Sequence, residues 1–118
     1  PYADGVDCGG PWAGRLVTFI DANRDGRLGG RERVIAVISP ISSGGSVRWR
    51  SFRNRQYLQF TPMGFTNYQN GNFVYCDASQ NRRYSRQIVL NVQGRARVMS
   101  QRDDSGHRVD RKGKPLRC

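Results

Sequence analysis

The residue types on which catalysis and metal binding most often depend are scarce in this chain. Its one histidine, His107, lies in a polar stretch, and its three cysteines are Cys8, Cys76 and Cys118. No Cys-x-x-Cys pair occurs, and Walker, Gly-x-Ser-x-Gly and His-Glu-x-x-His patterns are missing. A Cys3His zinc site made from these four residues would lack the local spacing that zinc sites show. We therefore expect no enzymatic activity and no bound cofactor.

Long apolar runs and helix-period patterns are also missing from the sequence. No stretch has the features of a signal peptide or a membrane span, and the chain opens at Pro1 without an initiator methionine, so we expect that an upstream segment has been removed. Fourteen glycines and many β-branched and aromatic residues favour strands instead. With 118 residues, the chain is expected to form one domain, residues 1–118, around a single core.

Acidic residues are few, nine against twenty basic ones, which gives a net charge of +11. All but two of the basic residues are arginine, whose guanidinium group binds phosphate or carboxylate through two parallel hydrogen bonds. This bias suits a polyanionic partner, although a soluble protein encoded by a GC-rich genome would show it as well. The distribution favours a partner, because residues 82–118 contain eleven basic and only three acidic side chains.

Apolar segments of strand length recur roughly every ten residues, with short turns between them. This spacing predicts a mainly β, antiparallel fold. Trp12, in a turn-rich opening segment, is expected to anchor that segment in the core. In the third apolar segment, alternation turns Arg48 and Arg50 to one face and Trp49 to the other. We expect strands over Leu16–Ile20, Arg33–Ile38, Val47–Phe52, Gln56–Phe60 and Phe73–Cys76, followed by two more within residues 87–99.

Residues 87–99 combine an apolar strand, a turn at Gly94 and a second strand that opens with Arg95 and Arg97. Because side chains alternate along a strand, both guanidinium groups are expected on the same face, where they could clamp a phosphate. More basic residues lie in the turn before the first strand and in a basic C-terminal tail of about residues 100–118. A continuous positive surface of this kind would bind DNA without sequence preference. The alternative is a solvated charged face. The predicted DNA-binding residues are Arg95, Arg97, Arg82, Arg83, Arg86, Arg102, Arg111, Lys112 and Lys114.

The segment from Asp21 to Glu32 fits a calcium-loop template. Asp21, Asn23, Asp25 and Gly26 are followed by five residues and then Glu32, which is the EF-hand spacing. Strands are predicted on both sides, where an EF-hand has helices, and arginines in and beside the loop oppose cation binding. The alternative is a hairpin loop in which the Asp and Asn side chains bond their own backbone.

Cys118 is the last residue of the sequence, which suggests a staple that holds the tail. Cys76, at the end of an apolar strand, is its expected partner. Closing a loop of roughly 43 residues would contribute on the order of 4 kcal/mol in the chain-entropy model. Such a bond implies an oxidising compartment. Cys8 is then either free or bonded to a partner outside this sequence.

Six short elements follow one another between residues 12 and 98: Trp12-Ala-Gly14, Phe19-Ile-Asp21-Ala-Asn23-Arg-Asp25-Gly26, Glu32-Arg-Val34, Phe60-Thr-Pro62-Met-Gly64, Phe73-Val-Tyr-Cys76, and Ile88-Val89 with Gly94-Arg95-Ala-Arg97. Together they resemble the signature of the GspH/FimT family, the minor pilins and pseudopilins of type IV pili and type II secretion systems. The resemblance implies a globular domain of two small antiparallel sheets. It also makes the Asp21–Glu32 segment an ordinary connection between strands.

Full-length members of this family have an N-terminal hydrophobic helix, which is absent here. By the resemblance, that helix would anchor the protein in the inner membrane, at the periplasm, and would pack against other major and minor pilins in the extracellular pilus. Family members often have another cysteine upstream of the position of Cys8. By the resemblance, that cysteine would be the missing partner of Cys8.

The Gly-Arg-x-Arg form of the last element is closest to the FimT branch, which is implicated in the uptake of double-stranded DNA during natural transformation. Arg95 and Arg97 would then contact DNA. The alternative is a structural minor pilin or pseudopilin that primes assembly of a pilus or a type II secretion pseudopilus without binding DNA.

Overall fold

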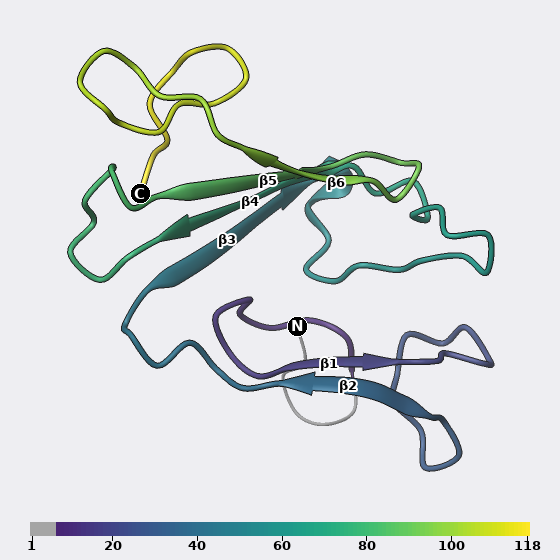
Figure 1. The fold of residues 1–118 in the computed structure, drawn as a ribbon. Helices are drawn as coiled ribbons and strands as arrows, with labels where there is room; N and C mark the ends of the chain where they lie inside the picture. Colours follow the sequence, from purple (N-terminus) through teal and green to yellow (C-terminus); the bar gives the residue numbers. More distant parts are fainter. Residues whose placement is uncertain (1–6) are drawn as a thin grey trace.

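The computed structural model describes residues 7–118 and is built mainly from β-strands, in two antiparallel sheets (Figure 1). The first sheet is a hairpin of β1 (Leu16–Phe19) and β2 (Val34–Ile38). The second has four strands in chain order, β3 (Ser46–Ser51), β4 (Gly71–Cys76), β5 (Arg86–Leu90) and β6 (Ala96–Met99), and a 3-10 turn, η1 (Phe52–Asn54), follows β3. The prediction of a mainly β fold with two small antiparallel sheets is confirmed.

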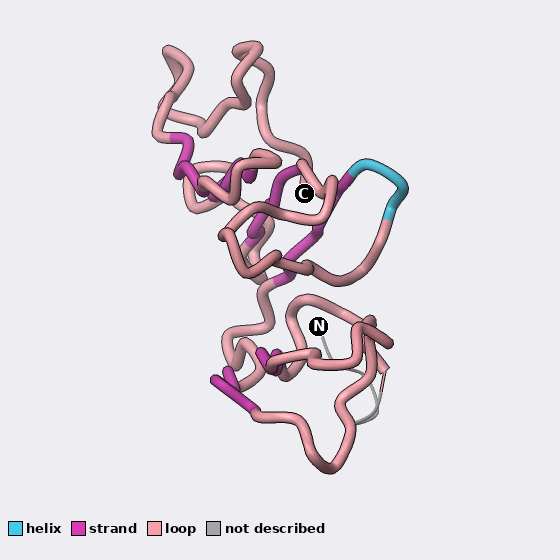
Figure 2. Tube along the Cα trace, turned by 90° about the vertical axis from the view of Figure 1, so that its right-hand side faces the viewer, coloured by secondary structure: helices cyan, strands magenta, loops and turns pink. Residues whose placement is uncertain are grey.

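The β1–β2 hairpin lies on one side of the four-stranded sheet, and residues 100–118, the tail, lie on the other (Figure 1). The view turned by 90° keeps this order (Figure 2). The molecule is accordingly elongated, with extents of 52 × 30 × 21 Å. The four-stranded sheet therefore has a hairpin face and a tail face, and alternation along its strands decides which residues each face receives.

Aromatic packing joins the hairpin face to the N-terminal segment. The register places Trp49, Phe73, Ile88 and Val98 in one cross-strand row. The Trp49 and Phe73 rings are stacked 4.3 Å apart, and Trp12 meets Phe73 edge-on at 4.7 Å and Trp49 at 6.0 Å. Trp49 is only 3% exposed. Trp12 thus anchors the opening segment, as its aromatic bulk predicted.

The tail face is covered in part by the tail itself. Leu116 packs with Val74 and Cys76 in a buried cluster, and Cys76 is bonded to Cys118, which confirms the predicted disulfide. The tail forms two loops, closed by backbone pairing of Arg102 with Arg108 and of Val109 with Pro115. A segment expected to be a polar tail is therefore folded onto the sheet.

The predicted strand Gln56–Phe60 is wrong, because residues 55–70 form a loop whose one β-bridge joins Phe60 and Thr66. The buried side chain of Gln69 takes the place of a neighbouring strand. Its Oε1 accepts the Gln59 N–H at 2.7 Å, and its Nε2 donates to the Tyr57 carbonyl at 2.6 Å. The remaining predicted strands are found with bounds shifted by one or two residues.

Gly94 occupies the expected turn, with φ of 80°. A Cβ at this position would collide with the Gly64 carbonyl oxygen. Loop 55–70 is thus packed against the β5–β6 turn, and the Thr66 N–H donates to the Val92 carbonyl at 2.9 Å. This contact holds the turn that leads into Arg95 and Arg97.

Candidate nucleic-acid interface

The net positive charge of the protein comes entirely from its C-terminal part. Residues 1–45 contain five basic and five acidic side chains, whereas residues 46–118 contain fifteen basic and four acidic ones. The whole net charge of +11 therefore lies on the four-stranded sheet, its loops and the tail. Charge segregated in this way creates a local positive potential, which attracts polyanions.

Most acidic side chains of this part are bonded to their own turns. Asp77 accepts the Asn81 N–H at 3.1 Å, and Asp110 accepts the N–H groups of Lys112 and Lys114 at 2.8 and 3.0 Å. Asp103 accepts the His107 N–H, the main reason that its pKa is lowered. Among residues 7–118, Arg27 forms an ion pair with Asp7, and the His107 imidazole lies 3.6 Å from a carboxylate oxygen of Asp103. The arginines of the C-terminal part are thus without carboxylate partners among the described residues.

Arg95 and Arg97 are exposed at the start of β6. The Asn91 side chain fixes the turn before them, because its Oδ1 accepts the Arg95 N–H at 2.9 Å. Arg97 is opposite Val89, in a cross-strand row with Asn72 and Arg50. Alternation puts this row, Arg97 included, on the tail face. Arg95 lies in the turn before β6, so its place on the same face stays a prediction.

The turn that carries Arg82, Arg83 and Arg86 lies at the other end of β5 from Gly94 (Figure 1). Arg82 and Arg83 are exposed, but Arg86 donates from Nη1 to the carbonyls of Arg83 and Ser85, at 3.3 and 2.9 Å. The Ser85 hydroxyl is 3.1 Å from the Cys118 sulfur, so this turn meets the end of the tail. The predicted residues accordingly form two groups, one at each end of β5. The continuous positive surface expected from the sequence is therefore split in two along β5.

The basic residues of the tail are displayed on its two loops. The exposed Arg102 donates to the Gly106 carbonyl at 2.7 Å, within the first loop. The second loop exposes Arg111, Lys112 and Lys114 around the cap supplied by Asp110. The pKa of Arg108 is lowered by burial and by the neighbouring positive charges of Arg102 and Arg86. Repulsion of this kind marks a region where cations gather without compensation.

Sequence reasoning missed two basic residues, Arg48 and Arg50, on the tail face. They line a groove of about 270 Å³ between the sheet and the tail, together with Lys114 and Arg117. The Arg48 guanidinium donates to the Arg117 carbonyl at 2.5 Å. Alternation had already placed Arg48 and Arg50 on one face. That this is the face covered by the tail depends on packing between residues almost 70 positions apart.

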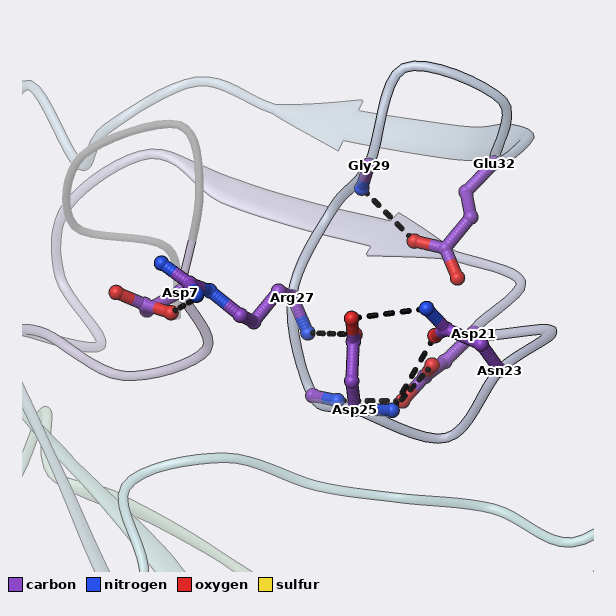
Figure 3. Close-up of polar contacts among 8 residues, drawn as sticks. Asp7, Asp21, Asn23, Asp25, Arg27, Gly29 and Glu32 are labelled. Atoms are coloured by element: carbon purple, nitrogen blue, oxygen red, sulfur yellow. Dashed lines mark hydrogen bonds and ion pairs between the residues drawn. The ribbon is translucent and has the colours of Figure 1, made fainter.

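The Asp21–Glu32 segment is a loop held by its own backbone (Figure 3). Asp21 accepts the N–H groups of Asp25 and Gly26 at 3.0 and 2.9 Å, and Glu32 accepts those of Ala22 and Gly29 at 3.0 and 2.9 Å. Oxygens of Asp21, Asp25 and Glu32 lie within 4.8 Å of one another, a spacing that would suit a cation. Asn23 donates to Asp25 at 2.9 Å. These bonds account for the loop without a metal, as a hairpin connection.

Comparison with known proteins identifies one family. The profile of the type II transport protein GspH matches residues 3–94, most of the chain, and ends immediately before Arg95. No curated protein and no solved structure matches the chain. Among residues 7–118, no helix is long and apolar enough to cross a membrane. The matched residues include the β1–β2 sheet and three strands of the four-stranded sheet. Because the match covers well over half of the chain, the chain belongs to the GspH family of type II transport proteins.

Proposed function

We propose that this GspH-family protein is a minor pilin of the FimT type, which binds double-stranded DNA without sequence preference during natural transformation. The family supports a minor pilin or pseudopilin role, association with other pilins or pseudopilins, and a periplasmic or extracellular location. In the proposal, an N-terminal helix outside this sequence anchors the protein in the inner membrane before assembly. The globular domain acts by binding, without catalysis.

The observation that carries the proposal is the uncompensated charge of residues 46–118. This part has fifteen basic side chains and only four acidic ones. Three of those four, Asp77, Asp103 and Asp110, accept backbone N–H groups of their own turns. Exposed guanidinium groups without carboxylate partners are available to phosphates, which accept their hydrogen bonds in the same forked geometry.

Such contacts would position DNA through its backbone and release condensed counterions. If about five phosphates are neutralised, the logarithm of the binding constant should fall with the logarithm of salt concentration with a slope near −4 to −5. Arg95 and Arg97 would supply one group of contacts, and the 82–86 turn with the adjoining tail would supply the other.

Salt titrations with short duplex DNA test the proposal. We expect Arg95→Gln/Arg97→Gln to weaken binding about tenfold and to make the slope shallower by about 2. The matched control is Arg31→Gln/Arg33→Gln, which removes the same charge from two exposed arginines of the neutral N-terminal part. Binding that is insensitive to salt, or equal losses in the two variants, would contradict a localised phosphate-contacting surface.

A structural minor pilin or pseudopilin without DNA binding is the second candidate, and β2 favours it. Every residue of β2 is exposed although its sequence is entirely apolar, with Ile35 59% and Val37 58% exposed. Such a surface suits contact with neighbouring subunits. Transformation and pilus assembly separate the candidates: the Arg95/Arg97 variant should lose transformation and keep assembly under the DNA-binding proposal, and should lose assembly if its arginines face other pilins.

A further inference from the structure

The groove between the tail face and the tail has the composition of an anion site. Four basic side chains and one acidic one line it, and the acidic one, Asp110, already accepts the backbone N–H groups of Lys112 and Lys114. Arg48 uses part of its guanidinium on the Arg117 carbonyl. The Arg50 side chain makes no hydrogen bond or ion pair with the other described residues, and its forked donors are open to a ligand.

A buried amide in the wall of the same groove is incompletely bonded. Gln87, on β5, is only 7% exposed and lines the groove. Its Oε1 atom has no hydrogen-bond partner among residues 7–118. Buried polar atoms in folded proteins are nearly always paired, so an unpaired one points to a bound molecule or an ordered water. Because Oε1 is an acceptor, a phosphate oxygen cannot bond it directly, and a donor such as a water of the hydrated anion would be needed; the amide nitrogen can donate to a phosphate oxygen.

We propose that this groove is a phosphate-binding subsite, formed by Arg48, Arg50, Lys114 and Arg117 with Gln87 in its wall, which holds one strand of the bound nucleic acid. Arginine forks match the oxygens of a phosphate, and a volume of about 270 Å³ admits one phosphate with part of its sugar. The identity of the anion rests on the proposed DNA binding. The existence of the anion site rests only on the groove.

Sheet register connects the subsite with the predicted DNA-binding pair. Arg50, Asn72, Val89 and Arg97 form one row across β3, β4, β5 and β6. With strands about 4.8 Å apart, the two arginines are separated by roughly 14 Å, which corresponds to about four nucleotides along a duplex axis. A strand laid across the tail face would therefore meet the groove at one edge and Arg95 with Arg97 at the other.

Two titrations of the full chain test this subsite. In the first, inorganic pyrophosphate is added and amide resonances are followed by NMR. We expect shifts at the Gln87 side-chain amide and at Lys114, and their loss in Arg50→Gln. In the second, duplex DNA is titrated against salt. Arg48→Gln/Arg50→Gln should weaken binding about fivefold to tenfold and make the slope shallower by 1 to 2, unlike the Arg31→Gln/Arg33→Gln control.

The outcomes distinguish this inference from the proposed function. If Arg95→Gln/Arg97→Gln weakens DNA binding while Arg48→Gln/Arg50→Gln behaves like the control, the subsite is overturned and the proposed function stands. If DNA does not bind but pyrophosphate shifts Gln87, the anion site stands and DNA binding falls, and an acidic protein segment becomes the ligand to test. If pyrophosphate leaves Gln87 and Lys114 unshifted, the subsite is overturned. Arg50→Gln alone removes no hydrogen bond of the fold, so it keeps the test valid if the double variant is unstable.

Discussion

Both parts of the molecule use aspartate caps in their loops, but residues 1–45 are neutral overall and residues 46–118 are strongly positive. In residues 1–45, Asp21 and Glu32 bond backbone N–H groups of one loop, and Asp7 pairs with Arg27. In residues 46–118, Asp77 and Asp110 bond backbone N–H groups in the same way. Both parts therefore shape their loops with aspartate caps, and only the C-terminal part adds an excess of arginine around them.

The two parts also differ in what covers their sheets. The four-stranded sheet receives the tail on one face and Trp12 on the other, so that Trp49, Val74 and Cys76 are buried. The β1–β2 hairpin has exposed apolar residues throughout β2. The four-stranded sheet is thus covered in part on both faces, on one of them by Trp12 of the N-terminal part, whereas β2 leaves an apolar surface of the kind that suits contact with a partner.

Removal of the Cys76–Cys118 disulfide should destabilise the C-terminal part most. Cys76→Ala/Cys118→Ala is expected to lower the free energy of unfolding by about 4 kcal/mol, because the unfolded chain regains the freedom of a loop of roughly 43 residues. Urea unfolding measures the loss, and hydrogen exchange should locate it in β4, β5 and the tail. Cys8→Ser is the control, with a change within about 0.5 kcal/mol. Equal loss of exchange protection in β1 and β2 would show that the two parts unfold as one unit.

Trp12→Ala should separate the two parts. The indole packs on Trp49 and Phe73 and donates to the Gln56 Oε1 at 3.2 Å, so its loss is expected to cost about 3 kcal/mol. Tyr84→Ala, an exposed aromatic residue of the β4–β5 turn, serves as the control. A change no larger than that of the control would mean that other contacts hold the N-terminal part on the sheet.

Asp21→Ala should lower the unfolding free energy by about 1 to 2 kcal/mol, because the amides of Asp25 and Gly26 lose their acceptor. Asp104→Ala, at an exposed acidic residue of the tail, is the control. Thermal unfolding with and without millimolar calcium tests whether the same loop binds calcium. We expect no calcium-dependent rise in Tm. A rise that Asp21→Ala abolishes would establish a calcium site. The aspartates of the N-terminal part would then bind a cation as well as their own backbone, unlike those of the C-terminal part.

The smallest effect concerns the thiol of Cys8, the one cysteine without a disulfide partner in residues 7–118. Partial burial is the main cause that raises its pKa above the usual value, and the nearby charge of Asp21 adds to the effect. Because the thiolate is the reactive form, alkylation near pH 8 should be several-fold slower than for an exposed thiol, and it should accelerate as the pH rises. A rate equal to that of the exposed thiol at pH 8 would contradict this environment.

Local patterns were sufficient for several parts of the fold. Strand spacing and turn residues predicted an antiparallel β fold and the turn at Gly94, and the family resemblance implied two sheets. The position of Cys118 after the last strands predicted the staple. The false strand at Gln56–Phe60 arose because its pattern is strand-like, whereas the partner of its backbone is the Gln69 side chain. The periodicity of a sequence does not show that a side chain takes the place of a neighbouring strand.

The candidate site was predictable in composition but not in arrangement. The excess of arginine is visible in the sequence, yet the division of Arg82–Arg86 from Arg95 depends on their positions at opposite ends of β5. Arg50 joins the tail face only because the disulfide and Leu116 bring the tail back over β4. The family profile matches residues 3–94, which include β1 to β5 but neither β6 nor the basic residues from Arg95 onward.

The Cys76–Cys118 bond also makes residues 76–118 a covalent ring that contains β5, β6 and the tail. All nine arginines and lysines first predicted to contact DNA lie inside it. One cut by a trypsin-like protease at any exposed arginine of this ring releases no fragment while the disulfide is intact. On an exposed filament, the surface rich in protease sites would thus stay attached to its subunit after nicking, and the damage would be seen only on a reducing gel.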